Sequence, residues 1–224
     1  MDLFDRLRAA RPDDWRAYVA HPFVDGLGDG TLPAAAFQSY LVQDYLFLIQ
    51  FARAYALAIY KSRTLDEMRT ALSGVKAILD TEMDLHVRLC AGWGLGPSEL
   101  ERAPEGRATI AYTRFVLDCG QRGDLLDLYV ALAPCVVGYA DIAAALARRP
   151  GGISESNPYR DWILEYSGPL YQEVARSARA NLDRLARLAL TEARFDDLAE
   201  TFGRASRLEA DFWSQGFDVL FAAG

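Results

Sequence analysis

The feature that most constrains the fold is an unbroken run of helix-forming residues after Pro33. Residues 34–62 read AAAFQSYLVQDYLFLIQFARAYALAIYKS and contain neither glycine nor proline. Alanine and leucine are strong helix formers, and apolar side chains cover nearly every face of this helix. A helix that is apolar nearly all round belongs in the middle of a bundle, so this segment predicts an all-α protein.

The rest of the chain continues the helical pattern, and no segment shows convincing strand-and-turn alternation. Glycine and proline residues interrupt the helical pattern, for example from Gly94 to Pro97 and at Gly168-Pro169. We expect about seven or eight helices in all. The linkers are short and polar, which predicts one domain over residues 1–224. Beyond the first segment, helices are predicted over about 65–93, 107–121, 124–149, 159–167, 169–189 and 192–221.

Charge and composition narrow the possible partners. The net charge of -7 and the pI of about 4.9 argue against a nucleic-acid or anionic-membrane surface. No stretch approaches the roughly 20 uncharged apolar residues of a membrane span. The three cysteines form no C-x-x-C pair and follow no secretory signal. We therefore expect a cytoplasmic protein with reduced thiols and no membrane partner.

Three polar residues in apolar helical stretches are the candidates for chemistry, because burial without a partner is costly. Asp44 either forms an internal salt bridge or hydrogen bond, or it binds an amine-bearing ligand. Cys135 follows Pro134 inside a helix; it is either an inert packing residue or a thiolate activated by a nearby base. Glu209 lies just before Trp213 and is either a general acid or base, or a solvated carboxylate paired with arginine.

Other residues are unremarkable when considered alone. Tyrosines such as Tyr112, Tyr139 and Tyr166 normally pack in the core with a satisfied hydroxyl. Glu82 and His86 form a single Glu-x-x-x-His, whereas a di-iron bundle needs several glutamates and two Glu-x-x-His motifs. We expect no metal site. The chain also lacks a Walker loop, a GxGxxG opening a helix and a GxSxG, so nucleotide binding and serine hydrolysis have no support.

Several short motifs follow one another in the order found in the TenA/thiaminase-II family. The first runs from His21 through Gln43-Asp44-Tyr45 to Phe51-Ala-Arg-Ala-Tyr55. The later motifs are Ala111-Tyr112-Thr113, Pro134-Cys135-Val-Val-Gly-Tyr139, the run from Asn157 to Tyr166, and Glu209-x-x-Phe212-Trp213. Each motif is short, but the ordered set spans nearly the whole chain. On this basis the chain resembles that family.

The resemblance implies a haem-oxygenase-like helical bundle that assembles as a homotetramer. It implies hydrolysis at the methylene carbon of an aminopyrimidine, without a metal or an organic cofactor. The implied substrates are 4-amino-5-aminomethyl-2-methylpyrimidine and, as a second substrate, thiamine. The product is the hydroxymethylpyrimidine, which places the reaction in thiamine salvage.

The resemblance also implies roles for individual residues. Cys135 is the nucleophile that adds to the pyrimidine ring, and Glu209 moves protons to and from the leaving group or ring. Asp44 holds the ring's amino group and a ring nitrogen. The pocket is lined by Tyr112, Tyr139 and Tyr166.

One position departs from the family pattern. Phe47 stands where many members have a tyrosine, three residues after Asp44 and on the same helical face. The ring is kept and the hydroxyl is lost, so stacking is expected to survive while substrate preference stays open.

Two other functions remain compatible with the sequence. One is a pyrimidine-binding or regulatory protein without turnover, although the acidic chain has no helix-turn-helix or basic patch for DNA. The other is an oxidase or oxygenase on the same fold, because a fold alone does not decide function. The two histidines are poorly placed for ligation, which counts against this second alternative.

Overall fold

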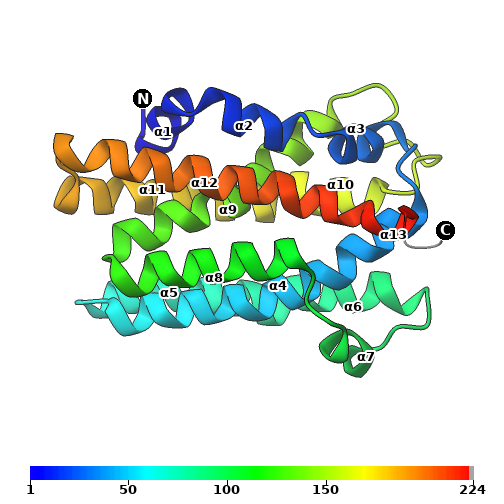
Figure 1. The fold of residues 1–224 in the computed structure, drawn as a ribbon, viewed down its shortest axis with the longest axis horizontal. Coiled ribbons are helices and arrows are strands. Elements are labelled where there is room, and N and C mark those ends of the chain that lie inside the picture. Colours follow the sequence, from blue (N-terminus) through cyan, green and yellow to red (C-terminus); the bar gives the residue numbers. More distant parts are fainter. Residues whose placement is uncertain (222–224) are drawn as a thin grey trace. The chain divides into compact units, whose positions relative to one another are not determined.

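The structure is a computed structural model that describes residues 1–221. These residues form helices and contain no strand, which confirms the all-α prediction (Figure 1). In chain order the elements are α1 (Leu3–Ala10), α2 (Pro12–Val19), α3 (Pro22–Asp29), α4 (Ala34–Lys61), α5 (Leu65–Ala77), the π-helical turn η1 (Ile78–Glu82), α6 (Met83–Ala91), α7 (Pro97–Arg102), α8 (Arg107–Arg122), α9 (Leu125–Ala147), α10 (Arg160–Ser167), α11 (Pro169–Ala189), α12 (Glu192–Gly216) and α13 (Asp218–Phe221).

The described helices outnumber the seven or eight that the sequence suggested. The additional ones are mainly α1, α2, α3 and α7, each six to eight residues long. Helices this short complete about two turns, too few for an apolar period to show in the sequence. Their caps are nevertheless visible locally. Asp2 accepts a hydrogen bond from the Asp5 N–H at 2.8 Å, and Pro12 and Pro22 each open a helix.

The chain forms two compact units, each built from segments that are distant in sequence. The first unit contains residues 1–33 and 129–214, and the second contains residues 34–128 with the C-terminal segment from Gln215. The chain passes between the units after Pro33, within α9 and within α12. The expectation of one domain over residues 1–224 stays a prediction.

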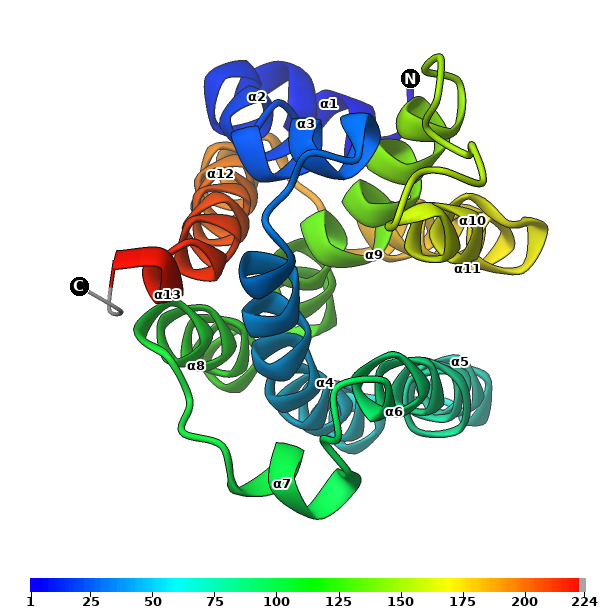
Figure 2. The same cartoon turned by 90° about the vertical axis from the view of Figure 1, so that its right-hand side faces the viewer.

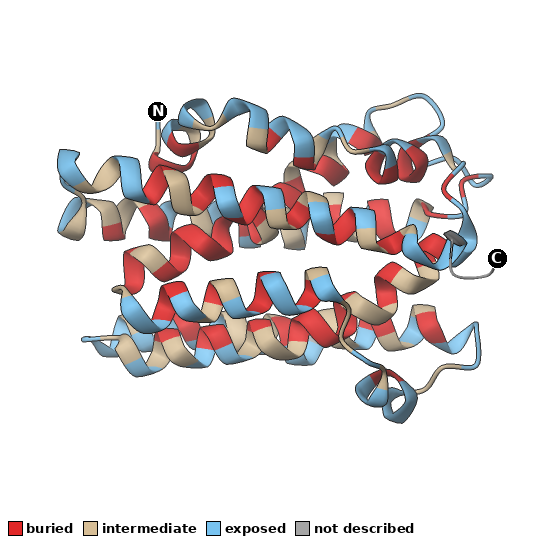
Figure 3. Ribbon diagram, viewed as in Figure 1, coloured by how far each residue is buried: buried red, intermediate tan, exposed pale blue. Residues whose placement is uncertain are grey.

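The second unit is built around α4. Helices α5, α6, α7, α8 and α13 all contact α4, and Figure 2 shows α8 and the α5–α6 pair on opposite sides of it. Buried residues recur on most faces of α4, which confirms the central position predicted from its sequence (Figure 3). They include Phe37, Tyr40, Leu41, Asp44, Leu48 and Phe51.

The predicted helix over residues 65–93 is interrupted in the structure. The π-helical turn η1 separates α5 from α6, and the Met83 N–H donates back to the carbonyl of Ile78. Such a turn adds one residue and rotates the faces of the helix that follows, and it is frequent at functional sites. Helix α6 ends at Ala91, two residues earlier than expected, and Gly94 takes a left-handed φ of 76° in the turn beyond it.

In the first unit, the N-terminal helices pack on α12 through aromatic rings. The ring centroids of Phe4 and Phe202 lie 5.4 Å apart, and Trp15 stacks on Phe202 at 5.8 Å. Helix α1 also packs on α11. Figure 1 shows α1 and α2 running beside α12. Through these ring contacts, residues near the two ends of the chain pack in one core.

Helix α9 is long and apolar enough to cross a membrane by length and composition, contrary to the sequence expectation. Of its most apolar stretch, 72% is buried inside the structure. A buried core helix passes the same test as a membrane span, so this property alone is weak evidence for a membrane.

We predict that His21 makes the stability of the protein depend on pH. Its Nδ1 accepts the Phe23 N–H at 3.2 Å at the start of α3, and its Nε2 lies 3.0 Å from the Ser214 hydroxyl. Burial lowers the pKa of His21 below 6.5, although Asp25 and Asp211 act in the opposite direction. The neutral ring therefore stabilises the fold above pH 6.5, the ordinary pKa of histidine. This contribution is lost as the pH falls through the lowered pKa of His21.

The control variant is His21→Asn, since asparagine also caps helices but does not titrate. Below about pH 6, the free energy of unfolding of wild type, measured by urea denaturation, is expected to fall by up to about 1 kcal/mol relative to this variant. This is the usual contribution of an N-cap. Parallel pH curves for the two proteins would contradict this role of His21.

Candidate functional site

Asp44 is a buried carboxylate in the middle of α4, with a residue exposure of 4%. Its Oδ2 accepts a hydrogen bond from the Tyr40 hydroxyl one turn earlier at 3.0 Å, and lies 2.6 Å from Nε2 of His86 in α6. Its Oδ1 accepts no hydrogen bond from the described residues. The internal hydrogen bond and salt bridge considered from the sequence are therefore present, and one carboxylate oxygen still remains for a ligand.

His86 is the partner of Asp44 in this pair, and it is fully buried. Its Nδ1 lies 2.8 Å from the carbonyl oxygen of Glu82, an atom that can only accept, so Nδ1 carries a proton. Burial would lower the pKa of His86, but the charge of Asp44 and its hydrogen bond outweigh burial and raise it. His86 is not among the residues predicted for the site, because nothing in the sequence indicates that it faces a carboxylate 42 positions away.

An aromatic pair lies one helical turn from Asp44. The ring of Phe47 is 5.1 Å from that of Tyr112 in α8, tilted by 34°, and 5.1 Å from that of Phe51. Tyr112 and Phe47 are both buried. The structure thus brings together three of the predicted site residues in the second unit, namely Asp44, Phe47 and Tyr112.

Gln43, the neighbour of Asp44, fixes the start of α8. Its side-chain oxygen accepts the Gly106 N–H at 2.8 Å and the Thr109 hydroxyl at 2.7 Å, and its nitrogen donates to the Pro104 carbonyl at 3.0 Å. Tyr112 lies one turn beyond Thr109. Gln43 belongs to the first of the ordered motifs, and its contacts hold the start of the helix that carries Tyr112.

Two of the three cysteines, Cys90 and Cys119, are buried packing residues. Cys90 is buried, and burial together with the charge of Asp44 raises the pKa of its thiol to about 11. Burial also raises the pKa of Cys119, although Arg122 acts in the opposite direction. Both thiols stay protonated at neutral pH and are poor nucleophiles.

Cys135 differs from them because it is partly exposed. It follows Pro134, which lacks the N–H that a helix would use at that point. The Tyr18 hydroxyl donates to the Pro134 carbonyl at 3.4 Å. A Cβ on Gly138 would lie 2.4 Å from the ring of Tyr18, so only glycine admits this close approach. Tyr18 and Gly138 therefore support the turn that carries Cys135.

Tyr139, one turn after Cys135, lies in a cluster of aromatic rings. Its ring centroid is 5.2 Å from that of Tyr166 in α10 and 5.3 Å from that of Trp213 in α12. Glu209 lies one turn before Trp213 and is only 1% exposed. The alternative of a solvated surface carboxylate is therefore wrong for Glu209. The first unit holds Cys135, Tyr139, Tyr166 and Glu209, and their catalytic roles stay predictions.

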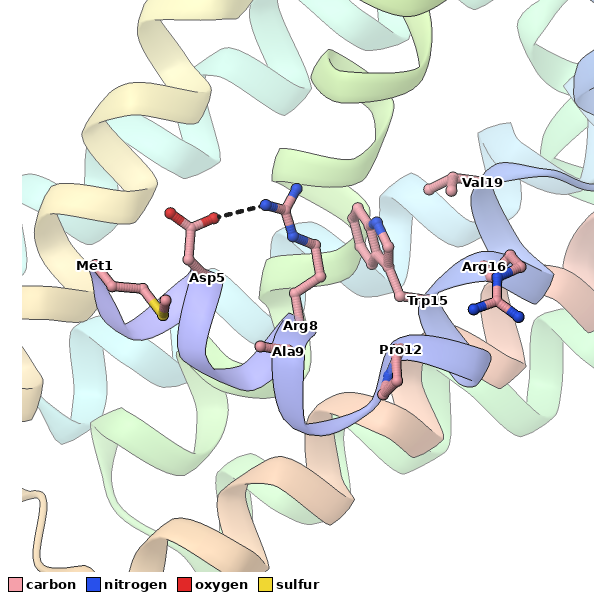
Figure 4. Close-up of a pocket in the computed structure, with 8 residues that line it drawn as sticks. All are labelled: Met1, Asp5, Arg8, Ala9, Pro12, Trp15, Arg16 and Val19. Carbon is pink, nitrogen blue, oxygen red and sulfur yellow. Dashed lines mark hydrogen bonds and ion pairs between the residues drawn. The ribbon is translucent and has the colours of Figure 1, made fainter.

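A cavity of about 560 Å³ opens between α1 and α2 (Figure 4). Asp5, Arg8 and Trp15 are among its lining residues, and Asp5 pairs with Arg8 at 3.0 Å. None of the predicted site residues lines it. Among the described residues, no group of three histidine, cysteine or acidic side chains could hold a metal ion.

The sequence profile of the TENA/THI-4/PQQC family matches residues 9–218. This chain belongs to that family. The resemblance that the ordered motifs indicated is confirmed, and it covers nearly the whole length of the chain.

Individual relatives agree with this assignment. The aminopyrimidine aminohydrolase of Halalkalibacterium halodurans is 38% identical over 204 residues, covering 91% of this chain and 90% of the relative. The crystal structure of a TenA family transcription regulator from Silicibacter sp. TM1040 is 43% identical, with a TM-score of 0.90 and 96% of each chain covered.

The fold class is confirmed by a more distant structure. A domain of unknown function from Shewanella denitrificans, described as having a heme oxygenase-like fold, matches with a TM-score of 0.71. The match covers 100% of this chain and 96% of that domain. At 16% identity this similarity concerns the fold alone.

We predict that Asp44→Ala destabilises the protein strongly, because it leaves the fully buried His86 without its counter-ion. Breaking one side of a buried pair costs about 3–5 kcal/mol. Since the pKa of His86 is raised in the fold, this loss is complete at low pH and diminishes as the pH rises through that pKa.

Urea denaturation near neutral pH checks this prediction. The matched variant is Asp44→Ala combined with His86→Leu, which removes both charges and is expected to recover much of the loss. Equal stability of the single and double variants would mean that the pair is energetically unimportant.

Proposed function

We propose that this chain is an aminopyrimidine aminohydrolase that acts on 4-amino-5-aminomethyl-2-methylpyrimidine. The observation that carries the proposal is the buried Asp44 carboxylate, with Oδ1 available, one turn from the Phe47–Tyr112 ring pair. Membership in the family and the relative named aminopyrimidine aminohydrolase support the same activity.

The second unit supplies what an aminopyrimidine requires for binding. A flat heteroaromatic ring stacks favourably on aromatic side chains such as Phe47 and Tyr112. Its exocyclic amine is an N–H donor that matches the free oxygen of Asp44. Both contacts lie among buried residues, where water competes poorly for the hydrogen bond.

The reactive roles in this proposal fall to Cys135 and Glu209, as the family resemblance implies. The Cys135 thiolate adds to a ring carbon, and the loss of aromaticity helps the C–N bond at the methylene to break. Water then adds to the methylene, and elimination of the thiolate restores the ring, so that amine and water become ammonia and alcohol. Glu209 transfers the protons to and from the leaving amine and the ring. The scheme uses no metal or organic cofactor.

Thiamine is the second candidate substrate, because it presents the same aminopyrimidine with a thiazolium in place of the amine. Phe47 lacks the hydroxyl that many family members have at this position, so the ratio of the two rates is the informative quantity. We also infer a cytoplasmic location from the three unpaired cysteines.

The Cys135→Ser variant tests the reaction. It is expected to lose turnover of the aminomethylpyrimidine by roughly a thousandfold or more, as when a covalent nucleophile is removed. Cys119→Ser is the matched control and should retain activity, because Cys119 is buried with a protonated thiol. Formation of the hydroxymethylpyrimidine is followed by chromatography, with thiamine tested in parallel.

The outcomes separate the remaining functions. Retained activity in Cys135→Ser would disprove cysteine catalysis. Binding of the pyrimidine by wild type without any product would favour the binding or regulatory alternative instead.

We further infer that the protein assembles as a homotetramer, as the family resemblance implies, and that an exposed apolar stripe on α5 forms one of its interfaces. Leu65, Met68 and Leu72 lie on one helical face and are 66%, 36% and 44% exposed. Contiguous apolar side chains at a surface mark interaction sites, and a second copy of the chain offers the same stripe.

Light scattering after size exclusion checks the assembly. Wild type should have the mass of four chains of 24.9 kDa, and Leu72→Glu should reduce it. Leu188→Glu is the control, since Leu188 is 73% exposed near the end of α11, away from the stripe in sequence. A monomeric wild type would refute the inference.

A further inference from the structure

Both described interactions of Asp44 use the same oxygen. The Tyr40 hydroxyl donates to Oδ2 at 3.0 Å, and Nε2 of His86 lies 2.6 Å from that same atom. A carboxylate oxygen has two lone pairs, so these two partners saturate Oδ2. Only Oδ1 has acceptor capacity left. Oδ1 is therefore the oxygen of Asp44 that remains open to a ligand.

The position of one proton follows from the hydrogen bonds of His86. Its Nδ1–H is committed to the Glu82 carbonyl at 2.8 Å. If Nε2 carried no proton, its lone pair would face a carboxylate lone pair at 2.6 Å, which is repulsive. A proton must lie between Nε2 and Oδ2. It belongs mainly to the imidazole, because a histidine is the stronger base and Tyr40 stabilises the carboxylate form.

The groups around the pair are consistent with this charge state. From α4, Tyr40 and Asp44 face the imidazole, and from η1 the Glu82 carbonyl accepts its other proton while the Glu82 carboxylate adds negative charge. Cys90, one turn beyond His86 in α6, has a thiol that stays protonated and adds no charge. The imidazolium is therefore the only cation that these neighbours bring to Asp44.

We propose that His86 is a positioning residue that keeps Asp44 ionised by donating to Oδ2 and leaves Oδ1 as the single oxygen that binds the ligand. The inference rests on the proposed function, because the ligand it describes is the aminopyrimidine. Its exocyclic N–H groups donate to Oδ1.

The first experiment needs neither substrate nor a substitution at residue 86. The chain has only two histidines, so in ¹⁵N-histidine NMR the His21→Asn variant leaves a single signal set, from His86. We expect both nitrogens of His86 to be protonated from about pH 5 to about pH 8, beyond the usual histidine range. An unprotonated Nε2 at neutral pH would overturn the proposal.

The second experiment measures kcat and KM for the aminomethylpyrimidine against pH in His86→Gln. Glutamine keeps an N–H donor to Oδ2 but cannot carry a charge, so the variant lacks the positive charge that the imidazolium places beside the carboxylate. We expect the acid limb of kcat/KM to rise by about 1–3 pH units. At about pH 6, KM should increase about tenfold with kcat changed less than about twofold.

The controls distinguish positioning from mere packing. His21→Asn removes the other histidine and is expected to keep the wild-type pH profile. If His86→Gln also keeps that profile, His86 has only a structural role and the proposal is wrong. If wild type neither binds nor converts the pyrimidine, the proposed function fails, and the NMR titration then decides the protonation of the pair. The titration also decides if His86→Gln does not fold.

Discussion

The arrangement of the second unit depends on one short contact, the 2.6 Å approach of His86 to Asp44. An ionised carboxylate in the middle of an apolar helix is strongly unfavourable unless a partner of opposite charge reaches it. Helix α4 can be the central helix of its unit only because α6 brings that partner to it. The contact joins two residues that lie 42 positions apart in the chain, so it also fixes how α6 packs on α4.

The π-helical turn η1 rotates α6 so that this contact can form. A regular helix from residue 65 onward would place His86 on a different face, because an inserted residue rotates everything after it by about 100°. The turn also gives Nδ1 of His86 its acceptor, since the Glu82 carbonyl belongs to the last residue of η1. One irregularity thus orients both nitrogens of the same ring.

In the first unit, a proline interrupts the regular helix. Pro134 interrupts the hydrogen bonding of α9 just before Cys135, and the Tyr18 hydroxyl donates to its carbonyl. Tyr139, one turn further on, packs its ring against Tyr166 and Trp213. A break in regular helical geometry thus comes just before Cys135 in the first unit and just before His86, the partner of Asp44, in the second unit.

The sequence by itself determined the helical class, the central role of α4 and the family, because these follow from long-range periodicity and from the order of motifs. It also singled out Asp44, Cys135 and Glu209 as polar residues in apolar surroundings. It did not reveal η1, the short helices or the partner of Asp44. A π turn has no periodic signature, and His86 is unremarkable until folding places it 2.6 Å from a carboxylate. Tertiary structure alone decided which oxygen of Asp44 is free, because that depends on side chains from two helices converging on one atom.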